Sequence, residues 1–151
     1  MEPTESDYTP LYTILEESIG CIKRMGMKVL DLGPQRVTLK MPLAGNESHV
    51  GTMYAGILFS VAEIPGGALF LTTFDPFQYV PLMKQMEIKY LKAARTDVTV
   101  SAEFSPEEVE RMNGELEEKG KTEFVLSCEV KDMEGNVVAV TTGTYLVRGN
   151  R

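Results

Sequence analysis

The chain has 151 residues, a formal net charge of −7 and a single histidine. This length suits one domain, and the shares of hydrophobic and charged residues, 43% and 25%, are those of an ordinary soluble globular protein. We therefore expect a single domain over residues 1–151, with residues 1–9 as a flexible tail. The acidic balance argues against nucleic-acid partners, because neutralising phosphates requires clustered lysine and arginine.

The sequence also lacks the marks of secretion, membrane insertion and metal binding. Residues 1–7 are acidic, whereas a signal peptide begins with a basic region and continues into an apolar one. Cys21 and Cys128 lie far apart, and with His49 as the one histidine they form neither a disulfide framework nor a metal-ligand cluster. We expect a cytoplasmic protein with no metal, no cofactor and no membrane contact.

The first third of the chain predicts a helix followed by a hairpin. Apolar residues recur at helical spacing from Pro10 to Met25, and Gly26 ends this helix. Residues 27–32 and 35–42 have the composition and alternation of two strands, joined by a turn at Gly33-Pro34.

A long apolar helix is predicted next, over about residues 53–74. Thr52 is expected to cap its first turn, after a polar loop over residues 43–50. Pro65 lies inside the run and lacks a backbone donor, so we expect a bend near it.

The rest of the chain predicts four strands and one amphipathic helix that opens at Ser105-Pro106. The strands fall at 82–94, 97–104, 122–131 and 137–148, and a turn at 133–136 joins the last two. This order predicts an α+β fold in which an antiparallel sheet of about six strands wraps around the central helix, with an extra N-terminal helix. One such sheet covers only part of an apolar helix, so we expect a homodimer or a dimer of dimers to cover the rest.

Glu63 is the one acid inside the apolar run of residues 53–71. An ionised carboxylate in an apolar interior must be paired, protonated or in chemical use. The residues alone leave two interpretations open, a structural buried acid and a catalytic group.

Two stretches of the chain carry a family signature. Residues 49–63, HVGTMYAGILFSVAE, and residues 86–95, MEIKYLKAAR, resemble hotdog-fold acyl-CoA thioesterases of the phenylacetate-degradation type. The resemblance is closer to a branch also found fused to acetyltransferases, in which an aromatic-alanine pair, here Tyr54-Ala55, replaces histidine-glycine. It implies a hotdog fold and hydrolysis of an acyl-CoA or acyl-carrier thioester.

The resemblance also implies roles for individual residues. Glu63 falls at the family's catalytic carboxylate, which acts as general base or nucleophile. Ala55 falls where a backbone N–H at the helix start faces the thioester oxygen. Ser48 stands where the family has asparagine, and this departure leaves Asn46 or His49 as alternatives for that role.

The remaining candidates concern substrate binding. Small residues recur at helical spacing around the carboxylate and predict a stripe along which an acyl thioester could lie. Basic residues near the end of the strand at 82–94 are candidate contacts for coenzyme A phosphates. The candidate substrate-binding residues are Asn46, Thr52, Tyr54, Gly56, Ser60, Gly67, Lys92 and Arg95.

Two other functions fit the same fold. In hotdog hydroxyacyl-thioester dehydratases a histidine and a carboxylate fourteen positions later form an acid–base pair, and His49 and Glu63 have that spacing. The departures at Ser48, Tyr54 and Ala55 also fit a module that binds acyl-CoA or lipid without turnover.

Overall fold

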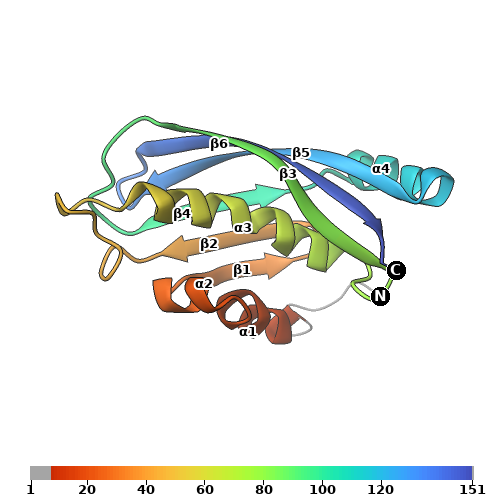
Figure 1. The fold of residues 1–151 in the computed structure, drawn as a ribbon, viewed down its shortest axis with the longest axis horizontal. Helices are drawn as coiled ribbons and strands as arrows, with labels where there is room; N and C mark the ends of the chain where they lie inside the picture. Colours follow the sequence, from red (N-terminus) through yellow and green to blue (C-terminus); the bar gives the residue numbers. More distant parts are fainter. Residues whose placement is uncertain (1–7, 151) are drawn as a thin grey trace.

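A six-stranded antiparallel sheet curls around one long helix in the computed structural model, which describes residues 8–150 (Figure 1). The strand order is β1-β2-β4-β5-β6-β3, and every pair of neighbours is antiparallel. The α+β architecture predicted from the sequence is therefore confirmed. The strands are β1 (Lys28–Gly33), β2 (Arg36–Met41), β3 (Tyr79–Tyr90), β4 (Val98–Glu103), β5 (Lys121–Asp132) and β6 (Val137–Gly149); the helices are α1 (Thr9–Glu17), α2 (Gly20–Met25), α3 (Ala55–Thr73) and α4 (Pro106–Lys119).

Helix α3 is the core of this fold. It packs against β2, β3, β4, β5 and β6, and residues such as Val61, Ala68 and Leu69 are fully buried. By length and hydropathy α3 could cross a bilayer, but here the sheet curls around it and buries about half of it, as expected for the core helix of a soluble domain. Its bounds agree with the predicted 53–74.

The two edges of the sheet differ in how they are covered. β1 forms one edge and is contacted by α1, which lies beside it in Figure 1. β3 forms the other edge over twelve residues, and Leu82, Met83 and Tyr90 are exposed on it. Pro81 also lies on β3, and proline is tolerated at an edge because no ladder donor is lost there.

The predicted helix over Pro10–Met25 is wrong in its continuity. It is broken into α1 and α2 at Ile19, whose backbone is extended (φ −102°, ψ 113°). A β-branched residue followed by Gly20 has low helix propensity, so the chain turns there at small cost. Of the expected N-terminal tail over residues 1–9, Thr9 belongs to α1, and residues 1–7 lie outside the described residues.

The predicted cap of the central helix is wrong as well. α3 begins at Ala55 and its N-cap is Tyr54, which makes no side-chain capping bond. Thr52 belongs to the preceding turn, where its carbonyl accepts from the Ser48 N–H at 2.6 Å and Gly51 adopts φ +85°. Beyond Pro65 the helix continues to Thr73.

Candidate active site

A surface pocket of about 530 Å³ lies at the start of α3. We call it the helix-start pocket. Its walls come from the loop before α3, the first turn of α3, and the segment that follows β3. It is lined by Ser48, His49, Thr52, Met53, Tyr54, Ala55, Leu58, Tyr90, Leu91, Lys92, Ala93 and Ala94.

The first turn of α3 presents unsatisfied donors at this pocket. Within residues 8–150 the backbone N–H groups of Ala55 and Gly56 have no acceptor. The Tyr90 hydroxyl donates to the Ala55 carbonyl at 2.9 Å and so ties this turn to the end of β3. Free N–H groups and the positive end of the helix dipole favour a negative charge, such as a developing oxyanion.

Tyr54 covers this turn from the outside. A Cβ atom at Gly56 would lie 2.9 Å from the Tyr54 ring, so glycine is required for the ring to pack there. Tyr54 remains more than half exposed, and its proximity contributes to the raised pKa of Tyr90, which partial burial dominates. Two phenol groups therefore border the N-terminal end of α3.

The loop residues proposed from the sequence divide into two groups. Ser48 and His49 line the helix-start pocket, and the Ser48 hydroxyl lies 3.4 Å from the Thr52 hydroxyl. Asn46 is buried, and its side-chain amide donates to the carbonyls of Met25 and Pro42, both at 2.8 Å. These bonds place Asn46 in the scaffold of the loop instead of the pocket wall.

Glu63 lies two turns along α3, in a different pocket. This second pocket, which we call the Glu63 pocket, has a volume of about 270 Å³ and lies between α1, α3 and Pro81. Within residues 8–150 the Glu63 carboxylate has no hydrogen-bond or ion-pair partner, and burial raises its pKa. A partly buried, unpaired acid with a raised pKa has the properties of a general base.

Tyr145 of β6 holds the backbone at Glu63. Its buried hydroxyl donates to the Glu63 carbonyl at 2.8 Å, and its ring packs so closely on Gly66 that a Cβ there would lie 2.1 Å from the ring. Burial raises the pKa of the Tyr145 phenol, with further contributions from Glu63 and Cys128. The phenol therefore stays neutral and acts as a fixed donor.

The predicted stripe of small residues lies on the face of α3 that the sheet leaves open. Gly56, Ser60, Glu63 and Gly67 are all partly exposed, while residues between them such as Val61 are buried. The Ser60 hydroxyl donates to the Gly56 carbonyl at 2.8 Å and is thus engaged with its own helix.

The stripe does not unite the predicted catalytic groups within one chain. Ala55 and Glu63 are eight residues apart, which on an α-helix is about 12 Å along the axis. They line different pockets, and so do His49 and Glu63. Lys92 lines the helix-start pocket, whereas Arg95 is exposed and lines neither.

Three contributors to the site were missed from the sequence. Tyr90 lies inside the family signature, but no role was assigned to it. Tyr145 lies in a segment whose pattern predicted a strand and nothing more. Helix α1 was predicted, but nothing in its pattern indicated that it borders Glu63. Within residues 8–150 no group of three or more histidine, cysteine or acidic residues could hold a metal ion.

Comparison with known proteins assigns the family. A family model described as "Domain of unknown function (DUF4442)" matches residues 19–147. The chain belongs to this family. The crystal structure of a Pseudomonas aeruginosa protein of unknown function, described as a probable thioesterase, is similar with a TM-score of 0.91 and 38% identity, covering 99% of both chains.

More distant proteins are similar to this DUF4442 chain in fold or in sequence. The crystal structure of a thioesterase from Haemophilus influenzae is similar with a TM-score of 0.72 and 14% identity, over 99% of this chain and 93% of that one. A protein of Saccharolobus solfataricus named "Putative esterase" is 24% identical over 135 residues, which is 89% of this chain and 87% of that protein. The hotdog fold expected from the sequence is thereby confirmed.

Proposed function

We propose that this DUF4442 protein is a thioester hydrolase that acts on acyl-CoA or acyl-carrier substrates. The observation that carries the proposal is the unpaired, partly buried Glu63 on the same helix whose first N–H groups are unsatisfied. The similarity to proteins described as thioesterases and as an esterase supports it. The narrower resemblance to the phenylacetate-degradation type remains a prediction from the sequence.

The chemistry requires a base and an oxyanion donor. As general base, the Glu63 carboxylate takes a proton from water, and the water oxygen attacks the thioester carbonyl carbon. The carbonyl oxygen becomes negative and accepts a hydrogen bond from the Ala55 N–H. The C–S bond then breaks, the protonated Glu63 carboxyl gives its proton to the leaving thiolate, and a free acid and a thiol leave. As nucleophile, Glu63 would instead form an anhydride that water then cleaves.

Both groups must lie about 3 Å from one thioester, and an axial separation of about 12 Å prevents that within one chain. We therefore propose that each site is composite, with Glu63 from one copy and the Ala55 N–H from a second. The exposed edge of β3 supports such an assembly. β3 pairs with β6 on one side only, so the backbone groups on its outer side, together with exposed Leu82 and Met83, form a surface that a second β3 can cover. A stable monomer in sedimentation at micromolar concentration would contradict this assembly.

The first experiment measures thiol release from a panel of acyl-CoAs by wild type and by Ala55→Pro. Proline at the first helical position removes the N–H and costs no structural hydrogen bond, since this N–H has no acceptor. Tyr54 already has the extended backbone (φ −60°, ψ 138°) that a residue before proline needs. We expect kcat to fall by about 10²- to 10³-fold, the usual effect of losing one oxyanion donor.

Ala55→Gly is the matched control, because it changes the same side chain and keeps the N–H. We expect it to stay close to wild type, and an equal loss in both variants would exclude the N–H as oxyanion donor. Absence of hydrolysis by wild type, with tight acyl-CoA binding, would instead support a binding module.

A mixing experiment tests the composite site. Ala55→Pro and Glu63→Gln chains are co-expressed with different tags and the mixed dimer is isolated. One of its two sites then combines an intact Glu63 with an intact Ala55. The isolated mixed dimer should show roughly half of the wild-type rate if the sites are composite, and none if each chain forms its own site.

Lys92 is the candidate contact for the substrate's phosphates, since it lines the helix-start pocket. Lys92→Gln should raise KM for acyl-CoA and leave KM for the corresponding acyl-pantetheine, which has no phosphate, unchanged. Arg95→Gln is the control at an exposed position outside the pocket. Equal effects of both variants on acyl-CoA would remove Lys92 from the binding site.

A further inference from the structure

The Glu63 pocket has a chemical character unlike that of the helix-start pocket. Apart from Ser18, Gly67 and Glu63, the residues that line it are aliphatic or aromatic and come from α1, the break after it, α3 and Pro81. Among residues 8–150, Glu63 is the one charged residue that lines it. Ile14 of α1 and Ile19, at the break between α1 and α2, border it and are about half exposed, at 45% and 54%. Apolar surface left open beside an unpaired carboxylate is a place for an apolar ligand to bind.

Gly67 keeps this pocket open. It lies one turn beyond Glu63 on the same face of α3, and a Cβ placed on it meets no atom within 4 Å. A glycine in the middle of a helix is less favourable than alanine, so this residue is not there for the stability of the helix. The space it leaves extends the pocket away from the helix start and continues from the carboxylate.

We propose that the Glu63 pocket binds the acyl chain of the substrate and selects uncharged aliphatic chains. This inference rests on the proposed function, because Glu63 must act at the thioester for the chain to enter beside it. A volume of about 270 Å³ is too small for a whole acyl-CoA but suits part of one. In the composite site, the thiol arm lies in the helix-start pocket of one copy and the acyl chain continues into the Glu63 pocket of the other.

The lining sets the class of acyl group. A chain ending in a carboxylate would bring a second negative charge into an apolar space beside Glu63, which is unfavourable on both counts. Each methylene buried against these walls contributes about 0.8 kcal/mol, which is about a fourfold gain in kcat/KM. α1 thus acts as a wall of the acyl site and not only as a cover for β1.

The test compares kcat/KM along a series from acetyl-CoA to dodecanoyl-CoA, with succinyl-CoA as the charged member. Wild type should gain about fourfold per methylene until the pocket is full, and should discriminate against succinyl-CoA relative to butanoyl-CoA. Gly67→Leu places a side chain in the pocket and should lower the ratio of decanoyl-CoA to acetyl-CoA activity by more than about tenfold, equivalent to two or more methylenes.

Gly114→Leu is the matched control. Gly114 is also a helical glycine whose Cβ would meet no atom within 4 Å, but it lies exposed on α4, away from the pocket. The ratio should remain that of wild type in this variant. If Gly67→Leu does not fold, Ser18→Phe fills the pocket from the α1 side and should lower the ratio in the same direction.

The outcomes separate this inference from the proposed function. An unchanged ratio in a folded, active Gly67→Leu or Ser18→Phe would overturn the acyl pocket and leave the hydrolase standing. If Gly67→Leu changes the oligomeric state in sedimentation but leaves the ratio of decanoyl-CoA to acetyl-CoA activity unchanged, Gly67 belongs to the interface between copies. That result would also overturn the acyl pocket. No hydrolysis of any member of the series by wild type would overturn both proposals.

Discussion

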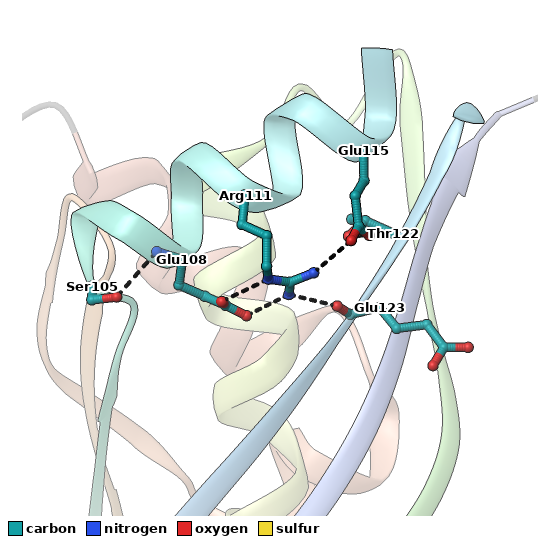
Figure 2. A network of polar contacts seen from close by, with 6 residues as sticks. All are labelled: Ser105, Glu108, Arg111, Glu115, Thr122 and Glu123. Carbon is teal, nitrogen blue, oxygen red and sulfur yellow. Dashed lines mark hydrogen bonds and ion pairs between the residues drawn. The ribbon is translucent and has the colours of Figure 1, made fainter. Parts of the chain in front are cut away.

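Helices α3 and α4 hold glutamates in opposite environments. On α4, Arg111 donates to both oxygens of Glu108, to Glu115 at 3.1 Å, and to the carbonyl of Glu123 on β5 at 2.9 Å (Figure 2). The hydrogen bond from Arg111 lowers the pKa of Glu108, and the Thr122 hydroxyl, 2.7 Å from Glu115, is the largest cause of the lowered pKa of Glu115. On α3, Glu63 has no such partner among residues 8–150, and burial raises its pKa.

The contrast shows what each helix does in the fold. α4 is amphipathic, and Ser105 caps its first turn by accepting a hydrogen bond from the Glu108 N–H at 3.1 Å. Glu115 and Arg111 of α4 bind β5 through Thr122 and the Glu123 carbonyl. α3 is apolar almost throughout, so it offers Glu63 no charged partner, and ionising this carboxyl costs free energy. Paired glutamates stabilise the structure, whereas the unpaired one is available to react.

The largest expected effect comes from exchanging each acid for its amide. Glu63→Gln should lower acyl-CoA hydrolysis by about 10²- to 10⁴-fold, because the amide is not a base. Glu108→Gln, the same change on α4, should leave the rate unchanged. Hydrolysis rates at matched fractions of folded protein check both, and equal rates in Glu63→Gln and wild type would exclude Glu63 from the chemistry.

The stability of the same two variants should diverge with pH. The raised pKa of Glu63 means that its ionisation destabilises the fold above the ordinary glutamate pKa, so Glu63→Gln should be more stable than wild type at neutral pH and equal to it in acid. The lowered pKa of Glu108 has the opposite sign. Its contribution is present above the ordinary pKa and is lost as the pH falls through the folded-state value, so Glu108→Gln should be less stable at neutral pH.

Urea unfolding at several pH values measures this divergence. Activity adds an independent check, since the acidic limb of kcat/KM should lie above the ordinary glutamate pKa if free Glu63 is the base. An acidic limb at or below the ordinary value would contradict the raised pKa.

A smaller effect is expected at the support of Glu63. Tyr145→Phe keeps the ring on Gly66 but removes the bond to the Glu63 carbonyl, and should cost about 1–3 kcal/mol of unfolding free energy. Tyr79→Phe is the control, because within residues 8–150 the Tyr79 hydroxyl has no hydrogen-bond partner. Equal changes in urea unfolding for the two variants would mean that the Tyr145 bond does not support α3.

The smallest effect is expected at Arg111. Arg111→Met should cost less than about 1 kcal/mol, because partly exposed ion pairs contribute little and salt screens them. The difference from wild type should shrink further in high salt and leave hydrolysis unchanged. A loss of hydrolysis in Arg111→Met would show that α4 affects the active site. It would contradict the separation of a structural role for α4 from a chemical role for α3.

Much of the fold was predictable because it follows from local patterns. The composition of residues 122–131 predicted the strand that became β5, and the run around Glu63 was too apolar to lie anywhere but the core. The break at Ile19 and the N-cap of α3 at Tyr54 instead of Thr52 were not predicted. Both depend on where the helices meet the sheet and the preceding turn, and neither Thr52 nor Gly20 indicated this alone.

The site was predictable in part for the same reason. Glu63 stood out because a charge in an apolar run conflicts with burial, and this conflict is visible in the sequence. Tyr145 lies 82 residues away along the chain, and its bond to Glu63 depends on the register of β6 against the curled sheet. The buried position of Asn46 in the loop before α3 was equally hidden, because its partners come from two separate segments.

The sequence by itself determined the fold class, the core helix and the one carboxylate that the core cannot pair, since composition and periodicity act over neighbouring residues. Only the tertiary structure decided that α1 walls the pocket beside Glu63 and that the helix start lies in a different pocket. Those facts depend on how elements distant in the chain pack together, and the rise of an α-helix then keeps Ala55 and Glu63 of one chain too far apart to share a substrate atom.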